Sequence, residues 1–284
     1  MAEFLDEIIM VMKRMYGKEI SVYDDDFLMK SIERRLNETG TGTLSEYSAL
    51  LRSSEYEAEC FFYSLHIYFS RFFRNPLTFA ILEQNLFPDI ISGKREGGEI
   101  RIWSAGCSNG QEAYSMAMIL SDLAESGAKN IRYRIFATDI REEAISAGKS
   151  GVYEESAIQD IKKKYLDKYF VRNGEDYSIV PEIKQHVSFS NYDLLDMSTS
   201  NLPESIYGDF DVVVCSNVLI YYKAEIQRII IRKLQQATAL YGYLITGESE
   251  ISLVGNVARM MTLSVQTAIF QNCGKRQDYG RRQD

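Results

Sequence analysis

The spacing of apolar positions separates a helical N-terminal part of the chain from a longer part in which strands and helices alternate. Apolar residues first recur at helical spacing at Phe4, Leu5, Ile8, Ile9 and Met12. Further helices are predicted at about residues 27–36, 44–51, 55–66 and 77–93. Pro76 disfavours helical conformation in the residue before it. We therefore expect an all-helical N-terminal domain over residues 1–75, followed by a linker helix and loop over residues 76–98.

From residue 99 onward, short apolar runs alternate with amphipathic segments. The expected strands are residues 100–104, 132–138, 186–190, 210–215, 242–246 and 263–271. Such alternation predicts an α/β fold, in which helices cover both faces of a mostly parallel, Rossmann-like sheet. The largely apolar run at 210–215 is typical of a central parallel strand. We expect this domain to span residues 99–274.

Two smaller features complete the predicted organisation. Strand-like runs flank Asn173 and Gly174, a pair that favours tight turns between antiparallel strands. A short β-hairpin subdomain is therefore expected at about residues 165–183. Residues 275–284 are polar, and we expect them to form a flexible tail.

The most informative stretch follows the first expected strand, where Gly106 and Gly110 lie in a loop before an amphipathic helix. A strand, a glycine loop and a helix in this order form the entry unit of nucleotide-binding α/β domains. The Gly-x-x-x-Gly spacing differs from that of dinucleotide sites, and no Lys-Ser/Thr pair follows as in a P-loop. An adenosine ligand without phosphates, such as S-adenosylmethionine (SAM), therefore fits better.

The second expected strand ends on an acidic residue, Asp139. In such folds, the acid that closes the second strand accepts hydrogen bonds from the ribose hydroxyls of the ligand. The alternative is that Asp139 caps the helix predicted to begin at Arg141, because aspartate is a favoured N-cap residue. The preceding glycine loop favours the ribose role.

Composition and charge exclude several classes of function. Hydrophobic residues make up 45% and charged residues 25% of the 284 positions, as in ordinary soluble proteins. No apolar run approaches the ~20 residues of a membrane helix, and the acidic N-terminus differs from a secretory signal. We therefore expect a cytoplasmic protein without membrane insertion. The net charge of −8 argues against nucleic acid as a partner, and the scattered cysteines and histidines predict no metal site.

Three segments together resemble the CheR family, the SAM-dependent methyltransferases that esterify receptor glutamates in bacterial chemotaxis. They are Phe-Phe-Arg-Asn at residues 72–75, Arg-Ile-Trp-Ser-Ala-Gly-Cys-Ser-Asn-Gly-Gln-Glu-Ala-Tyr-Ser at 101–115 and Cys-Ser-Asn-Val-Leu-Ile-Tyr at 215–221. Gly-Glu-Ser-Glu at 247–250 also looks like a motif of that family. The resemblance extends from about Tyr16 to Phe270. It implies a SAM-dependent methyltransferase fold, SAM as cofactor and S-adenosylhomocysteine (SAH) as product.

The resemblance also implies roles for single residues. Arg74 and Tyr221 match residues of the methyl-transfer site, and Glu112 matches the glutamate that binds the methionine amino group. The residues expected around the cofactor are Ser70, Arg74, Gly106, Glu112, Asp139, Asp193, Leu194, Asn217 and Val218. Two alternatives stay open: Arg74 forms a salt bridge between the two domains, and Tyr221, one of 19 tyrosines, packs in the core.

The chain departs from the family pattern beside these motifs. Asn75 stands where an acid usually follows the arginine, Gln111 replaces a glutamate, Ala113 a proline and Ser216 an arginine. The implied function is methyl transfer to glutamate side chains of a receptor or signalling protein. The departures keep open a catalytically impaired SAM-binding sensor or scaffold. A small-molecule methyltransferase is disfavoured, because the helical N-terminal domain resembles a protein-recognition element.

The implied chemistry needs few catalytic groups. A glutamate side chain is ionised near pH 7 and can attack a sulfonium methyl without a general base, while Arg74 can orient the incoming carboxylate. As partner we expect an acidic helical segment of the receptor, bound by Lys30, Arg34 and Arg35. Lys30 and Arg34 share one predicted helical face, for which a solvated surface is the alternative. We expect a monomer.

Overall fold

The chain folds into two units that do not follow a single division of the sequence. The computed structural model describes residues 2–66, 70–127, 132–196, 208–257, 260–263 and 267–274. The first unit combines Met1–Ile67 with Leu219–Gln227, and the second combines Tyr68–Val218 with Arg228–Asp284. The first boundary therefore falls before the expected residue 75, and the first unit takes a segment from deep within the expected second domain.

Helices form the first unit, as the apolar spacing predicts. They are α1 (Ala2–Tyr16), α2 (Asp25–Thr39), α3 (Leu44–Ser53) and α4 (Glu55–Ser64). The Asp24 side chain caps α2, which ends at Gly40 in the left-handed conformation (φ 71°). Thr43 and Glu46 form a capping box at the start of α3. The helices pack around a buried cluster that includes Ile8, Met12, Leu28, Ile32 and Phe61.

The segment Leu219–Gln227 belongs to the first unit because it pairs with the connection between α1 and α2. The backbone N–H of Lys223 donates to the carbonyl of Val22 at 3.0 Å. The ring of Tyr222 stacks on that of Tyr23, with 5.2 Å between the centroids. These contacts join residues that lie about two hundred positions apart, so periodicity alone could not reveal them.

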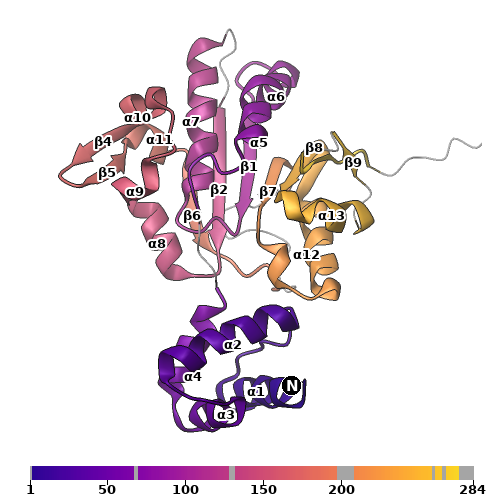
Figure 1. Cartoon of the computed structure of the whole chain (residues 1–284). Coiled ribbons are helices and arrows are strands. Elements are labelled where there is room, and N and C mark those ends of the chain that lie inside the picture. Colours follow the sequence, from indigo (N-terminus) through magenta and orange to yellow (C-terminus); the bar gives the residue numbers. More distant parts are fainter. Residues whose placement is uncertain are drawn as a thin grey trace, which may run out of the picture. The chain divides into compact units, whose positions relative to one another are not determined.

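The second unit is built on the predicted mostly parallel sheet, of order β6-β2-β1-β7-β8-β10-β9 within the described residues (Figure 1). Its strands are β1 (Glu99–Ala105), β2 (Arg132–Asp139), β6 (Val187–Asn191), β7 (Phe210–Cys215), β8 (Thr238–Thr246), β9 (Met261–Thr262) and β10 (Ile269–Gln271). The first five run parallel, and β10 pairs antiparallel with both β8 and β9. Among the described residues, the expected strand at 263–271 is found only at its end, as β10, and β9 lies just before its expected start.

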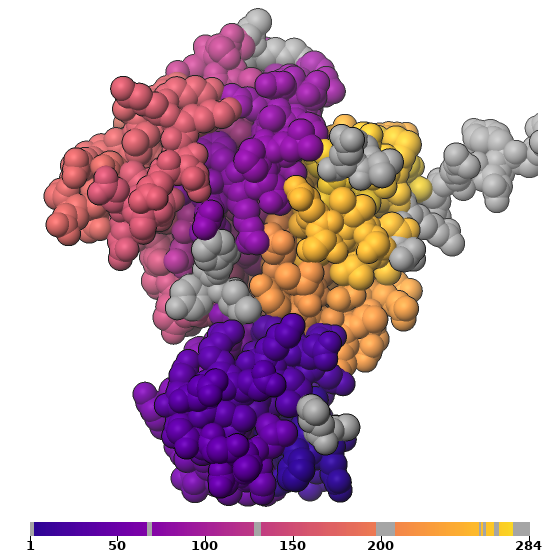
Figure 2. Space-filling model, viewed as in Figure 1, coloured from indigo at the N-terminus to yellow at the C-terminus, as the bar shows by residue number. Residues whose placement is uncertain are grey.

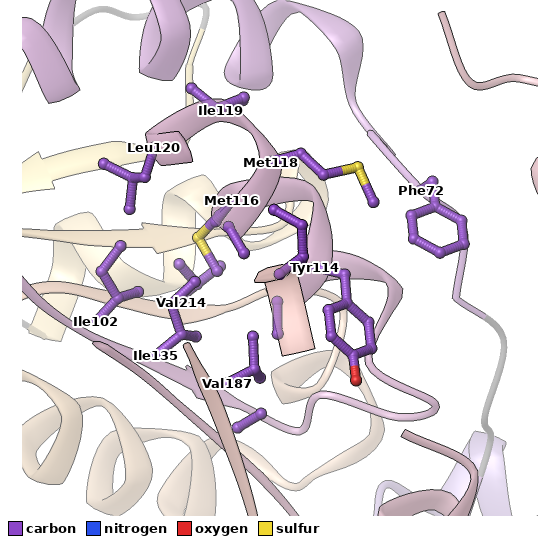
Figure 3. Close-up of a cluster of buried hydrophobic side chains, with 14 of the residues drawn as sticks. Phe72, Ile102, Tyr114, Met116, Met118, Ile119, Leu120, Ile135, Val187 and Val214 are labelled. Atoms are coloured by element: carbon purple, nitrogen blue, oxygen red, sulfur yellow. The ribbon is translucent and has the colours of Figure 1, made fainter. Parts of the chain in front are cut away.

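The second unit contains further helices. They are α5 (Pro76–Ile81), η1 (Leu82–Leu86), α6 (Phe87–Gly93), α7 (Gln111–Ser126), α8 (Glu142–Ser150), α9 (Glu155–Ile158), α10 (Lys163–Tyr169), α11 (Pro181–Lys184), α12 (Ala224–Ala237), η3 (Glu248–Glu250) and α13 (Ile251–Val257). Of these, α7 and α8 pack on this sheet, while α9 and α10 pack on a smaller one. The first turn of α12, up to Gln227, belongs to the first unit. Figure 3 shows Met116 and Leu120 of α7 against Ile102, Ile135 and Val214 of the strands. The expected helix at 77–93 contains a π-helical turn, η1, in its middle.

A small antiparallel sheet is attached to the second unit. Its strands are β3 (Val152–Glu154), β4 (Phe170–Asn173) and β5 (Asp176–Ile179), in the order β3-β5-β4. β4 and β5 form the predicted hairpin, with Gly174 at φ 69° in its two-residue loop. The pairing of β3 with β5 was not predicted. Figures 1 and 2 show this sheet at the periphery of the second unit.

Candidate functional site

Four of the expected cofactor residues lie at the carboxyl edge of the parallel strands of the second unit. Gly106 follows β1, Asp139 ends β2, Asp193 follows β6 and Asn217 follows β7. The sheet order reverses direction between β1 and β7, because β2 and β6 lie on one side and β8 on the other. Ligands of open α/β sheets bind outside such a switch point, at the carboxyl ends of the strands.

The glycine loop after β1 is tightly packed. Gly106 has φ 73°, and a Cβ atom at this position would lie 2.6 Å from Cγ2 of Val218. Two residues that the resemblance assigns to the cofactor are thus in contact. The backbone N–H groups of Gly106 and Cys107 both donate to the Thr138 carbonyl, at 2.8 and 2.9 Å. Any larger residue than glycine would displace the loop or Val218.

Asp139 is tied to the same loop. One carboxylate oxygen accepts from the backbone N–H of Ser108 at 2.9 Å, and the other accepts from that of Arg141 at 3.1 Å. The N-cap residue of α8 is Arg141 itself, so Asp139 does not cap this helix in the way the alternative supposed. A carboxylate offers about four acceptor positions, so both oxygens can still accept hydroxyl donors such as those of a ribose.

Glu112 lies partly buried at the start of α7 and accepts a hydrogen bond from the Ser104 hydroxyl at 2.7 Å. Burial raises the pKa of its carboxyl to about 7. Hydrogen bonds from Ser104 and Ser216 and the positive charge of Arg74 lower that pKa, whereas Glu250 raises it. A carboxyl group with a pKa near neutral pH can pair with a bound cation, because the positive charge favours its ionised form.

Arg74 and Glu112 line a common cavity of about 20 Å³. Its other walls come from Asn75, Thr78, Phe79, Leu82, Met116, Val214, Ser216 and Ile245. The volume admits one water-sized group. Within the second unit, the positive charge of Arg74 therefore acts on Glu112. The inter-domain salt bridge that the sequence left open stays a prediction.

The segment that presents Arg74 has an unusual backbone. Phe73 and Asn75, on either side of it, both have positive φ, 51° and 62°. Non-glycine residues adopt this conformation at a cost of about 1–3 kcal/mol and keep it only when their surroundings hold them. Here Phe73 stacks on Tyr165 with 5.0 Å between the ring centroids, and its N–H donates to the Ser115 hydroxyl at 3.0 Å.

Glu250 holds the ends of two neighbouring strands together and is fully buried. Its Oε2 accepts from the backbone N–H groups of Asn217 at 3.0 Å and of Gly247 at 2.7 Å. The sequence pointed to this residue only as part of a motif and gave it no role. Asn217 has φ 60°, so the Glu250 contact fixes a loop of strained conformation directly after β7.

Two amide oxygens in this region are buried and have no hydrogen-bond partner among the described residues, namely Oδ1 of Asn217 and Oε1 of Gln111. Buried acceptors of this kind are rarely left unpaired, so a bound group with N–H or O–H donors is the natural partner. An amino acid joined to an adenosine supplies such donors at both ends. The residues present thus fit SAM.

Asp193 and Leu194 lie in the segment that follows β6. The Asp193 carboxylate accepts from the backbone N–H of Leu195 at 2.8 Å, and Leu194 is buried. Lys233 of α12 donates to the carbonyls of this segment, a contact the sequence did not suggest. Its spacing of three residues from the apolar Ile230, which puts it on the inner face of α12, is a signal that could have drawn attention to it.

The remaining expected residues are placed as follows. Ser70 is partly buried in the second unit. Tyr221 belongs to the first unit, where its ring packs on Phe27 with 4.9 Å between the centroids. Its catalytic role stays a prediction.

The three expected receptor-binding cations of α2 differ in their surroundings. Lys30 and Arg34 are exposed. Arg35 is only 14% exposed and forms ion pairs with Glu57, at 2.5 Å, and with Glu38. Its guanidinium therefore helps to hold the first unit together. The ion pairs disfavour contact of Arg35 with a receptor, and that contact stays a prediction.

In the described ranges, no cluster of three or more His, Cys, Asp or Glu side chains is arranged to hold a metal ion. Within the same part of the chain, each helix is too short or too polar to cross a membrane.

Comparison with known proteins places these features in a family. The family description "CheR methyltransferase, SAM binding domain" matches residues 68–269. The chain is 31% identical over 256 residues to the chemotaxis protein methyltransferase of Escherichia coli (strain K12), covering 88% of this chain and 84% of that one. It is 28% identical over 240 residues to the enzyme of the same name from Listeria innocua, covering 84% and 87%.

A third relative is a much longer protein. The chain is 30% identical over 270 residues to an uncharacterized 104.1 kDa protein of the hypE 3' region of Rhodobacter capsulatus. This match covers 95% of the chain but spans only 28% of that protein's length. The family match contains the mostly parallel sheet and the residues at its carboxyl edge, which together form the fold of SAM-dependent methyltransferases. The chain belongs to the CheR methyltransferase family.

Proposed function

We propose that this protein transfers a methyl group from SAM to glutamate side-chain carboxylates of a receptor or signalling protein, forming glutamyl methyl esters and SAH. The observation that carries the proposal is that the charge of Arg74 acts on Glu112 while Asp139, at the end of β2, accepts from the backbone of the glycine loop, all within the segment matched to the family. The names of the Escherichia coli and Listeria relatives support a chemotaxis receptor as substrate.

The cofactor would be held by groups from four strand ends. Asp139 would accept from the ribose hydroxyls, and Glu112 would pair with the amino group of the methionine part. Asp193 and Leu194 would border the adenine. Ser70, Gly106, Asn217 and Val218 would complete the pocket. No metal takes part in this scheme.

When bound, SAM supplies an electrophilic methyl group on a sulfonium. The chain's own task is to align the attacking carboxylate and to exclude water, since a glutamate is already ionised near neutral pH. Arg74 can present its planar guanidinium to the carboxylate, and Tyr221 would help to position it. A site that is partly closed to water favours this reaction, because opposite charges cancel as the neutral ester forms.

The first unit would supply receptor recognition. Lys30 and Arg34 are exposed on α2 and can attract an acidic helical segment. We propose that the protein works as a cytoplasmic monomer with such a segment, without nucleic acid and without insertion into a membrane. Weak, salt-sensitive binding would suit an enzyme that visits several glutamates in turn.

The second candidate function is a SAM-binding sensor or scaffold without transfer activity. It is favoured by Gln111, Ala113 and Ser216, which replace family residues next to Glu112 and Asn217. Ser216 keeps a hydrogen-bonding side chain close enough to Glu112 to lower its pKa, which supports a working pocket. We therefore rank transfer above the sensor.

The test is incubation of the protein with SAM labelled on its methyl group and the cytoplasmic fragment of a cognate receptor. Methyl esters release volatile methanol in mild base, whereas methylated nitrogen does not, so base treatment separates esters from other products. A receptor fragment with its acidic helix residues changed to glutamine is the matched control. Transfer that gives base-labile label only with the glutamate fragment supports the proposal. Tight SAH binding without any transfer supports the sensor.

A further inference from the structure

A buried lysine on α12 holds the segment that follows β6. The Nζ of Lys233 donates to the carbonyl of Leu194 at 3.2 Å and to that of Asp196 at 2.6 Å. Lys233 is only 8% exposed. Lysine is rarely buried to this extent unless its ammonium group is satisfied by partners. The two carbonyls act as these hydrogen-bond partners. The burial of the lysine therefore depends on the position of the segment, and the segment is held by the lysine.

The same ammonium group lies over an aromatic ring. Nζ of Lys233 is 4.6 Å from the ring centroid of Tyr192, within the range of a cation–π contact. The backbone N–H of Tyr192 donates to the carbonyl of Asp139 at 2.9 Å, which joins the segment to the end of β2. Tyr192 also meets the ring of Trp103 edge-on, with 5.9 Å between the centroids.

We propose that Lys233 is a positioning residue for the adenine end of the cofactor site. It would act by fixing the backbone of residues 192–196, which the proposed function assigns to the adenine, and it would not touch the cofactor itself. This inference rests on the proposed contacts of Asp193 and Leu194. Its physical basis is that three contacts of one ammonium group converge on five consecutive residues beside Asp139.

Backbone carbonyls that lose a buried charged donor must find another partner or turn toward water. If Lys233 is replaced by an apolar residue, the carbonyls of Leu194 and Asp196 are left without this donor. The segment is then free to adopt conformations that do not match the adenine. The affinity for SAM or SAH would fall, because the ligand would have to order residues 192–196 when it binds.

The decisive comparison uses two lysines that both donate to backbone carbonyls. Lys233→Met removes the proposed contacts and keeps an unbranched side chain that is one atom shorter. Lys184→Met is the matched control, because Lys184 donates to the carbonyl of Ser150 at 2.6 Å from α11. SAH affinity is measured calorimetrically for each variant and the wild type, well below the unfolding temperature of each. We expect Lys233→Met to weaken SAH binding about tenfold or more and Lys184→Met to leave it within about twofold.

A spectroscopic readout separates positioning from general stability. Trp103 is the single tryptophan of the chain and contacts Tyr192, so its fluorescence reports on the segment. We expect Lys233→Met to change the emission of the unliganded protein, whereas the Lys184 control does not. If receptor methylation is measured, the KM for SAM should rise while kcat at saturating SAM stays within about twofold.

The outcomes are distinct. Lys233→Met that unfolds at a lower temperature but binds SAH as tightly as the wild type would overturn the inference. If that variant does not fold, Lys233→Gln replaces it, since an amide can still donate to one carbonyl. We then expect an intermediate loss of affinity, and an unchanged affinity would overturn the inference. SAH binding by the wild type without methyl transfer would refute the proposed function and leave this inference standing, whereas no SAH binding at all would refute both.

Discussion

The hydroxyl of Ser104 on β1 donates a hydrogen bond to the carboxylate of Glu112 on α7, with 2.7 Å between the two oxygens. The contact joins the strand that precedes the glycine loop to the helix that follows it. It favours the ionised carboxylate, yet burial is the larger effect and raises the pKa of Glu112 to about 7. The protonation of this group therefore changes within the physiological range of pH.

Ligand affinity should depend on pH through Glu112. A bound ammonium group favours the ionised carboxylate, so the pKa of Glu112 should fall below 7 in the complex. SAH affinity is then expected to be constant above about pH 7.5 and to fall below it, by up to about tenfold per pH unit. Calorimetry at several pH values measures this, with Glu112→Gln as the control whose affinity should be weak and independent of pH. A wild-type affinity that does not change down to about pH 6 would contradict the pairing.

The ribose role of Asp139 predicts a loss of affinity on truncation. Asp139→Ala removes the acceptors of the ribose hydroxyls and also frees the backbone N–H groups of Ser108 and Arg141. We expect SAH binding to weaken by about 1–3 kcal/mol. Asp139→Asn keeps one acceptor oxygen and should lose less. Calorimetry that gives the same affinity for Asp139→Ala and the wild type would remove this residue from the site.

Arg74 should matter more for transfer than for cofactor binding. We expect Arg74→Ala to lower the rate of methyl transfer while SAH affinity near pH 8 stays close to that of the wild type. Arg74 also lowers the pKa of Glu112, so its removal should move the pH midpoint of SAH binding upward. Arg71→Ala is a suitable control, because Arg71 pairs at the surface with Asp160. Transfer at the wild-type rate by Arg74→Ala would show that Arg74 has no catalytic role.

Receptor recognition by α2 can be tested by charge reversal at its exposed cations. Lys30→Glu combined with Arg34→Glu should raise the KM for an acidic receptor fragment and reduce its dependence on salt. SAH affinity should not change. If the doubly reversed variant methylates the fragment with the wild-type KM, the solvated-surface alternative is correct.

Replacement of Arg35 should lower the stability of the protein, unlike replacement of the exposed cations Lys30 and Arg34. Its guanidinium pairs with Glu57, which also accepts from the Tyr47 hydroxyl at 2.7 Å, and both members of the ion pair are largely buried. Arg35→Met leaves the Glu57 carboxylate without its cation, and we expect a loss of about 3 kcal/mol in the free energy of unfolding. Urea denaturation measures this, with Arg34→Met as the exposed control. Equal stability of the two variants would show that the ion pair contributes little.

The parts of the site that were predictable from sequence are local in the chain. Gly106 and Asp139 each follow a strand, and parallel strands bring their carboxyl ends to one edge. The order of strand, loop and helix was therefore enough to place them together. Arg35 shows the limit of this reasoning, because α2 periodicity cannot indicate that Glu57, 22 positions later, would neutralise it.

Contacts between distant segments were not predictable. Lys233 donates to a carbonyl 39 positions earlier, and helical spacing gives no sign of which backbone lies opposite. The π-helical turn at Leu82–Leu86 and the addition of β3 to the hairpin also depend on packing against other segments. A single sequence shows which residues are apolar or charged, but it does not show which loop lies beside them in the fold.

Two separate parts of the sequence build the first unit, and this limits where the protein can be divided into fragments. A fragment starting at residue 68 would keep the family-matched region but lose the α1–α2 connection. The ring of Tyr222 would then lack Tyr23, and the backbone of Lys223 would lack Val22. Such a fragment would expose an aromatic surface to solvent and would tend to aggregate during expression. Domain exchange between relatives should accordingly transplant residues 219–227 together with the N-terminal helices.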